Sequence, residues 1–349
     1  MKRILILYSE ISAYTQECLN DYLSFYANVK VTLIRWPVNL EAPFNFSWHK
    51  NISIINKSDV NLLAYLTDFN PNLILCSGWI DREYINLLSK TKKSYKKVLL
   101  VDNYWKNNIR QNLGLLYNRT MIKRHFDSCW VPSEFHKKYA FKLGFKKNEI
   151  KIGLYARNLN KYEVSYKKSI DLKSQKFPKN FIYVGRYLEL KGIYDLLDAF
   201  NEFSSKNNDW NLHCVGVKDL GRNSIENPLI HHHGFKSTEE ILKLIPKMGV
   251  FVMPSHYDHW CMAVNEFAAA GFPLLLSKNV GSSSTFLREG INGFSFSPKS
   301  KKSIIKALED ISALSDKELT KFAHESFNIS KVFDTKTWSK TLHEFLNNE

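Results

Sequence analysis

Short apolar runs alternate with longer segments of helical period along most of the chain. In the first half, the runs that predict buried strands are Arg3–Ser9, Lys30–Trp36, Leu73–Ser77, Val98–Asp102 and Cys129–Pro132. Segments with apolar side chains at helical spacing lie between them, at Gln16–Tyr26, Val60–Phe69 and Gln111–His125. This alternation is typical of β-α-β units that build a parallel sheet.

The alternation starts again at Phe181, after a lysine-rich stretch that contains Pro178. The strands predicted there are Phe181–Gly185, Asn211–Gly216, Val250–Pro254 and Pro273–Ser277, and the helices are Ile193–Ser204, Thr238–Ile245 and Asn265–Ala270. The sequence therefore predicts an α/β protein with two doubly wound, Rossmann-like domains that face each other across a cleft. We expect the first domain at 1–157, an interdomain connection at 158–180, the second domain at 181–331 and a closing helix at 332–349.

Composition narrows the class of protein. The 349 residues exceed what one hydrophobic core usually supports, and a hydrophobic content of 44% excludes intrinsic disorder. The five cysteines include no C-x-x-C pair, which argues against a disulfide scaffold or a structural zinc site and fits a reducing compartment. No apolar run approaches the roughly 18 residues that cross a bilayer. We therefore expect a cytoplasmic protein.

The charge is unevenly distributed. Lys and Arg number 49 against 34 Asp and Glu, a formal net charge of +15. Residues 1–150 hold 22 basic and 12 acidic side chains, whereas residues 181–349 hold 19 and 20. A basic protein that binds nucleic acid without catalysis is one interpretation, but no helix-turn-helix, RRM or zinc pattern accompanies the charge. The candidate chemistry instead lies in the nearly neutral second half.

The first segment with candidate functional residues is 252–273. Its pattern predicts a strand, a loop, a short helix and another strand. The backbone N–H groups at the predicted helix start belong to Cys261, Met262 and Ala263. A helix N-terminus with free donors favours phosphate. Asp258 and Glu266 precede and follow this point, and carboxylates accept hydrogen bonds from sugar and ribose hydroxyls. The alternative is a helix cap for Asp258 and a solvated Glu266.

A second segment, residues 181–192, is a buried strand that ends in a glycine turn. Gly185 begins the turn, which carries Arg186 and Lys191. Two cations at the carboxyl end of a strand can clamp a diphosphate, because Arg offers a fork of donors and Lys a point charge. A basic surface loop is the alternative reading of this segment alone.

The two segments match a pair of spaced motifs. A V-G-R…K-G-x-x-x-L-L-x-A-F pattern is met at Val184–Arg186, Lys191–Gly192 and Leu196–Phe200. A later pattern is met at Pro254–Ser255, Glu266, Ala268, Gly271–Pro273, Gly281 and Asn292–Gly293, with Gly234–Phe235 between the two. Over residues 181–298 the chain thus resembles the donor-binding domain of retaining glycosyltransferases of the GT-B fold, family four (glycosyl transferases group 1).

The resemblance implies a role for each matched position. Arg186 and Lys191 would hold the donor diphosphate, Asp258 would touch the donor sugar, and Glu266 would bind the ribose hydroxyls. Phe235 would lie next to the nucleotide base. Two positions depart from the pattern: Asp258 stands where the family has Glu, and Cys261 stands where it has a glycine that lets the backbone approach the donor.

The first domain is expected to bind the acceptor. Asp102 ends a predicted strand and is our first candidate for an acid near the acceptor hydroxyl, with Asp81 second. Helix capping and loop packing are the alternatives for each. The triplet His231–His233 invites a metal reading, but strand alternation sends its members to opposite faces and no acidic partner is suitably spaced. We expect no metal and no other cofactor.

The resemblance implies transfer of a sugar from a UDP- or GDP-sugar to a hydroxyl of a glycan or lipid-linked acceptor, with retention and without a metal. Synthesis of bacterial surface polysaccharide or lipopolysaccharide is the expected setting. Lysine runs in such acceptor domains suggest docking on an anionic membrane, here the inner face of the plasma membrane. A non-catalytic binder of nucleotides or nucleic acid, or a GT-B epimerase, is the alternative.

Overall fold

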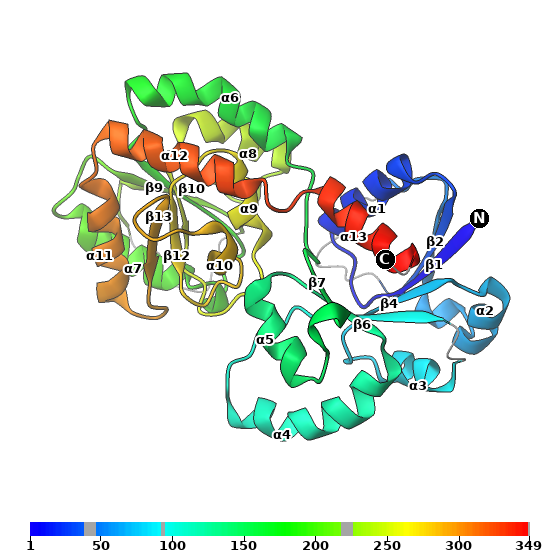
Figure 1. The fold of residues 1–349 in the computed structure, drawn as a ribbon. Helices are drawn as coiled ribbons and strands as arrows, with labels where there is room; N and C mark the ends of the chain where they lie inside the picture. Colours follow the sequence, from blue (N-terminus) through cyan, green and yellow to red (C-terminus); the bar gives the residue numbers. More distant parts are fainter. Residues whose placement is uncertain (38–46, 92–94, 218–225, 348–349) are drawn as a thin grey trace. The chain divides into compact units, whose positions relative to one another are not determined.

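A computed structural model describes residues 1–37, 47–91, 95–217 and 226–347. The chain divides into two compact units: Met1–Asn158 together with Phe333–Glu349 forms the first, and Leu159–Val332 forms the second. The chain therefore passes from one unit to the other twice (Figure 1).

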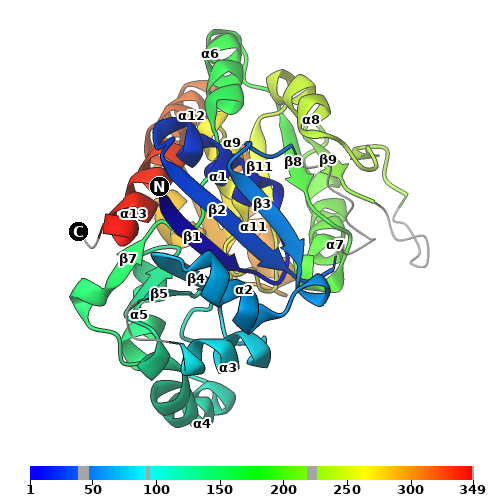
Figure 2. The same ribbon diagram turned by 90° about the vertical axis from the view of Figure 1, so that its right-hand side faces the viewer.

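The first unit is built on a parallel sheet of seven strands in the order β3-β2-β1-β4-β5-β6-β7. Figure 2 shows β1, β2 and β3 side by side. The strands are β1 (Lys2–Leu7), β2 (Val29–Arg35), β3 (Ile52–Asn56), β4 (Leu73–Ser77), β5 (Lys96–Leu100), β6 (Ser128–Val131) and β7 (Ile150–Ile152). The chain order reverses at β1 and β4, which is the switch point of a doubly wound sheet.

Hydrophobic clusters cover both faces of this sheet. Ile4 and Ile6 of β1 belong to one cluster, whereas Leu5 and Leu7 belong to the other, so successive residues are buried on opposite sides. The helices are α1 (Ala13–Phe25), α2 (Leu62–Phe69), α3 (Arg82–Lys90), α4 (Ile109–Tyr117), α5 (Glu134–Lys142) and α13 (Thr335–Asn347). Short helical turns are η1 (Lys57–Asp59), η2 (Asn118–Ile122), η3 (Lys123–His125) and η4 (Lys147–Glu149).

The C-terminal helix α13 completes the core of the first unit. Trp338, Leu342 and Phe345 recur at helical spacing and lie in the same cluster as Ile4 and Ile6. The indole Nε1 of Trp338 donates a hydrogen bond to the Leu154 carbonyl at 2.9 Å. The last helix in sequence therefore belongs structurally with the first strand.

The second unit has a parallel sheet of six strands in the order β10-β9-β8-β11-β12-β13. The strands are β8 (Asn180–Val184), β9 (Asn211–Val215), β10 (Ile230–His232), β11 (Val250–Met253), β12 (Leu274–Ser277) and β13 (Gly293–Phe296). The helices are α6 (Asn160–Gln175), α7 (Ile193–Ser204), α8 (Thr238–Leu244), α9 (Met262–Ala269), α10 (Ser283–Phe286), α11 (Lys301–Ser312) and α12 (Asp316–Ser330), with turns η5 (Glu189–Lys191) and η6 (Ile245–Lys247).

Two doubly wound α/β units confirm the predicted fold class. One predicted segment has a different structure: most of the expected connection at 158–180 is α6, which belongs to the second unit. Lys161, Lys167 and Lys168 of α6 are exposed. Tyr162, Tyr166 and Lys173 are buried, and the Tyr166 ring stacks on Phe327 of α12 at 4.0 Å. The lysine-rich composition masked an amphipathic helix.

Candidate functional site

The candidate site lies in the second unit, at the carboxyl ends of β8 and β11. These strands are direct neighbours in the sheet, so the segments that leave them emerge side by side. The segment after β8 carries Arg186 and Lys191, and the segment after β11 carries Asp258 and Cys261. The doubly wound topology thus brings together the two sequence motifs.

Lys191 and Asp258 form the central contact of the site. The Lys191 Nζ lies 2.5 Å from Asp258 Oδ2. Burial by itself lowers the pKa of Lys191, but the charge of Asp258 outweighs it and raises that pKa above its ordinary value. The charge of Arg186 acts in the opposite direction, which places a second cation in the same neighbourhood. Arg186 itself is exposed.

Asp258 is held in place by its surroundings. Its Oδ1 accepts a hydrogen bond from the Trp260 backbone N–H at 3.2 Å, while Oδ2 faces Lys191. Its backbone carbonyl accepts from the N–H of Gly281 at 2.9 Å. A Cβ at Gly281 would meet the His259 carbonyl oxygen at 1.9 Å, so only glycine permits this close approach. The loop around Gly281 therefore fixes the direction of the Asp258 carboxylate.

Cys261 is the residue that precedes α9. Its backbone has φ 67° and ψ 88°, a left-handed conformation that a side chain disfavours. Met262 and Ala263 form the first turn of α9, and both are half-buried. Burial, with Asp258 as a second cause, raises the pKa of the Cys261 thiol. The thiol is therefore a poor nucleophile at neutral pH.

Glu266 lies within α9 and is only 8% exposed. Its charge acts on the Cys261 thiol, as do the charges of Asp258 and Lys191. The predicted residues Lys191, Asp258, Cys261 and Glu266 are therefore neighbours in the folded unit. Phe235, by contrast, follows β10 and is 74% exposed.

Two glycines allow the backbone segments of the site to pack closely. A Cβ at Gly192, the residue after Lys191, would meet the Pro254 carbonyl oxygen at 2.1 Å. A Cβ at Gly216 would meet the Gly185 carbonyl oxygen at 2.0 Å. Both glycines have positive φ, which is a further reason that L side chains are excluded there.

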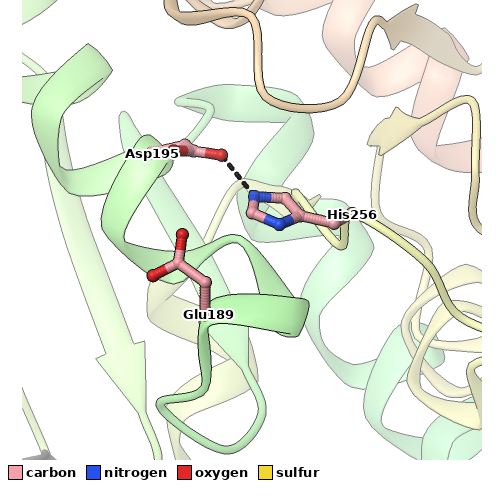
Figure 3. Close-up of side chains that lie close together, drawn as sticks. All are labelled: Glu189, Asp195 and His256. Atoms are coloured by element: carbon pink, nitrogen blue, oxygen red, sulfur yellow. Dashed lines mark hydrogen bonds and ion pairs between the residues drawn. The ribbon is translucent and has the colours of Figure 1, made fainter.

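A second side-chain cluster next to the site was missed by sequence reasoning. Figure 3 shows Glu189, Asp195 and His256, and the Nε2 of His256 lies 2.5 Å from Asp195 Oδ2. The three residues offer ligand atoms within 4.8 Å of one another, which makes them the one metal-capable group found among the described residues. Asp195 and His256 are 61 positions apart, and no spacing rule joins them.

The histidine triplet distributes its side chains over both faces of the sheet edge at β10. His231 and His233 share one face with His213 of β9: the His213 ring stacks on His231 at 4.6 Å, and its Nδ1 lies 2.9 Å from His233 Nε2. His232 points to the other face, where its Nδ1 lies 2.6 Å from the Tyr187 hydroxyl. Burial, followed by the two neighbouring histidines, lowers the pKa of His213 to about 4.

In the first unit, Asp102 follows β5 and contacts a tyrosine. Tyr155 donates its hydroxyl to Asp102 Oδ2 at 3.0 Å, and Tyr14 packs edge-on against Tyr155 at 5.4 Å. Burial, followed by the charge of Asp102, raises the pKa of Tyr155. Tyr8, Tyr14 and Tyr155 line a small pocket formed within this unit. Tyrosines around Asp102 were not predicted.

Asp81 has a structural environment. Its Oδ1 accepts hydrogen bonds from the backbone N–H groups of Glu83 and Tyr84, which caps helix α3. Its Oδ2 accepts from Trp36 Nε1 and lies 2.6 Å from Lys57 Nζ. Asp81 is therefore a helix cap, which was one of the two interpretations of this residue.

Most of the second unit matches a known family model. Residues 167–326 match the family model described as Glycosyl transferases group 1. A glycogen synthase of Mycobacterium tuberculosis is 26% identical over 141 residues, covering 38% of this chain and 34% of the relative. Spore coat protein SA of Bacillus subtilis is 28% identical over 130 residues, covering 33% and 34%. The chain thus matches about a third of the length of these curated relatives.

Solved structures share the fold over the whole chain. HepE of Anabaena, in complex with UDP and glucose, superposes with a TM-score of 0.72 at 15% identity and covers 100% of both chains. Sucrose-phosphate synthase of Thermosynechococcus elongatus gives 0.75 at 14% identity, covering 100% of this chain and 99% of that one. The protein therefore has the GT-B fold, and a stretch within 167–326 matches a glycosyltransferase family model.

Of the described residues, none belongs to a helix that is both long and apolar enough to cross a membrane.

Proposed function

We propose that the protein is a retaining glycosyltransferase that moves a sugar from a nucleoside diphosphate sugar to a hydroxyl of a glycan or lipid-linked acceptor. One observation carries the proposal: Lys191, Asp258 and the start of α9 meet at the ends of neighbouring strands, inside a segment with the family pattern. The similarity to HepE, which was solved with UDP and glucose, supports a uridine nucleotide as the first donor to test.

The chemistry asked of the site is stabilisation of a leaving group. The bond between the sugar C1 and the diphosphate oxygen breaks, and its electron pair stays on the diphosphate. The acceptor oxygen bonds to C1 from the same face, and its proton passes to the departing oxygen. Arg186, Lys191 and the N–H groups that begin α9 would bind the negative charge as it develops. Glu266 would accept hydrogen bonds from the ribose hydroxyls.

Asp258 has a separate role in this scheme. A carboxylate at the sugar can accept hydrogen bonds from sugar hydroxyls. The contact of Asp258 with Lys191 supports a position beside the proposed diphosphate site. Asp102, in the first unit, is our proposed acid on the acceptor side. Its Tyr155 contact keeps the carboxylate oriented.

The proposed chemistry requires no metal, because Arg186 and Lys191 would supply the positive charge that faces the diphosphate. Glu189, Asp195 and His256 are the residues that a metal would use if this proposal were wrong. The proposed setting is synthesis of surface polysaccharide or lipopolysaccharide at the inner face of the plasma membrane. The basic first half of the chain supports an anionic surface as a partner.

The test is a panel of UDP-, GDP- and dTDP-sugars, scored for hydrolysis and thermal shift in EDTA. We expect one donor to be turned over, and Arg186→Ala and Lys191→Ala each to lower turnover on the order of 100-fold. Lys317→Ala, which removes an exposed lysine of α12, is the matched control. Wild-type rates in both site variants, or full dependence on added metal, would refute the proposal. A shift with oligonucleotides but with no nucleotide would favour the non-catalytic binder.

A further inference from the structure

Helix α4 of the first unit exposes a stripe of large apolar side chains. Ile109, Leu113, Leu116 and Tyr117 are 79%, 76%, 74% and 60% exposed. Their spacing of four, three and one places them on one face of the helix. Met121, in the following turn η2, is also exposed. Single exposed apolar residues are ordinary, but a continuous helical stripe marks an interaction surface.

A different side of α4 packs against the core of the first unit. Leu115 packs against the hydrophobic cluster on one side of the sheet, and Ile122 is buried within that cluster. Leu115 lies two positions from Leu113, about 200° round the helix, so these two side chains leave α4 on opposite sides. Helix α4, labelled in Figure 1, is therefore seated on its unit by one face and presents a second apolar face outward.

Positive charge accompanies the stripe. Residues 106–147 contain ten Lys and Arg and only two Asp and Glu, which is a net charge of +8 out of +15 for the whole chain. Arg110 lies in the first turn of α4, and Arg119 and Arg124 follow it; all three are exposed. An apolar face with cations beside it is complementary to an anionic lipid surface, where apolar side chains enter the acyl boundary and cations meet phosphate.

We propose that α4 docks the protein on an anionic lipid bilayer, with the helix lying in the plane of the interface. The nine residues of α4 are far too few to cross the hydrocarbon core. A second copy of the chain is a poorer occupant, because its equally basic stripe would bring like charges together. The inference deepens the proposed function, since it rests on the membrane location proposed above and identifies the surface that makes the contact.

The experiment is co-sedimentation with vesicles of phosphatidylcholine alone and of phosphatidylcholine mixed with phosphatidylglycerol. Leu113→Gln combined with Leu116→Gln keeps good helix formers while removing the apolar face. Leu172→Gln, which changes an exposed leucine of α6, is its control. Arg110→Gln combined with Arg124→Gln is matched by Lys317→Gln combined with Lys321→Gln on α12, so that each pair loses the same charge.

We expect wild-type protein to sediment only with the anionic vesicles at low salt. Both α4 variants should partition on the order of tenfold less, and both controls should partition as wild type. If the Lys317 and Lys321 control loses as much vesicle binding as the arginine variant, net charge alone binds the membrane and the proposal fails. If the Leu113 and Leu116 variant binds vesicles as strongly as wild type, the role of α4 is overturned. A molar mass that doubles without vesicles and returns to monomer in that variant would assign the stripe to a second copy and refute the proposal.

Donor hydrolysis without vesicles separates this inference from the proposed function. The α4 variants should hydrolyse the donor at the wild-type rate, because α4 contributes no residue to the donor site. Hydrolysis without sedimentation would refute docking alone, and sedimentation without turnover of any donor would refute the transferase alone.

Discussion

Lys191 Nζ lies 2.5 Å from Asp258 Oδ2, so the ammonium group predicted to bind the donor diphosphate is paired with a carboxylate. The side chain of Asp258 is only 11% exposed, so the pair is largely shielded from water. A diphosphate that binds at Lys191 must compete with Asp258 for the same donor group. The contact therefore couples donor binding to the position of the residue predicted to touch the sugar.

We expect Asp258→Asn to separate binding from turnover. Removal of the competing carboxylate should leave UDP affinity unchanged or raise it several-fold, whereas turnover should fall on the order of 10- to 100-fold because sugar orientation is lost. Isothermal titration with UDP and steady-state rates measure the two effects. Lys191→Met is the reciprocal variant and should weaken UDP binding. Asp258→Asn that weakens UDP binding as strongly as Lys191→Met would contradict the competition.

Cys261→Gly should stabilise the second unit by about 1 kcal/mol. The left-handed backbone at Cys261 disfavours any side chain, and glycine removes that strain at some entropic cost in the unfolded chain. Urea unfolding measures the difference. Cys261→Ala is the control, since it removes the thiol but keeps the Cβ. Equal stability of the glycine and alanine variants would show that the backbone is not strained.

Lys173→Met should stabilise the second unit by about 1 to 3 kcal/mol at pH 7. The Nζ of Lys173 is buried on α6, lies 3.9 Å from the centre of the Phe272 ring and has no hydrogen-bond partner among the described residues. Burial lowers the pKa of Lys173 to about 7. Methionine fills a similar volume without the cost of desolvating an amine. Lys168→Met, on the exposed side of the same helix, should change stability little.

The pH dependence provides a second test at Lys173. Because the pKa in the folded state is below that of the unfolded chain, the unfolded chain binds the extra proton between about pH 7 and pH 10. Wild-type stability should therefore rise with pH across this window, and the rise should be smaller in Lys173→Met. Parallel curves for the two proteins would refute a depressed pKa.

His213 should remain neutral well below the usual range of histidine. Its pKa of about 4 is below that of the unfolded chain, so the stability it provides is complete above about pH 6.5 and is lost as the pH falls toward 4. NMR titration of the imidazole measures the pKa directly. His233→Asn removes one neighbouring charge and should raise the pKa of His213. Titration of wild-type His213 near 6.5 would contradict a pKa lowered by burial and by the neighbouring histidines.

The residues at strand ends could be predicted from sequence. Local apolar patterns locate the strands, and the carboxyl ends of parallel strands meet at one edge of the sheet. Lys191 and Asp258 are 67 positions apart, yet placing each after a buried strand was enough to expect them in one site. Asp195 and His256 are similarly far apart in sequence. Asp195 lies in helix α7 and His256 in a loop, so the rule about strand ends does not predict their contact. Their contact depends on the packing of the Gly192 turn against Pro254, which only the folded unit shows.

Short edge strands were the weakest part of the sequence prediction. β3 (Ile52–Asn56) and β13 (Gly293–Phe296) lie at sheet edges and bury fewer of their side chains than the central strands β11 and β12, so their apolar runs are less clear. The residues of β13 were interpreted only as part of a glycine motif. Helix α6 is difficult to predict for a different reason. One of its buried residues is Lys173, so an apolar pattern alone does not reveal the buried face of the helix.

The position of α13 has a consequence for how the protein tolerates truncation. The second unit, 159–332, is one continuous piece of chain inserted into the first, and the first unit is finished only when its last helix is made. A stop codon just after residue 332 would leave every strand intact, yet it would remove Trp338, Leu342 and Phe345 from the core around β1. During synthesis the inserted unit can fold before the unit that it interrupts in sequence, because the core of the first unit is completed only by α13.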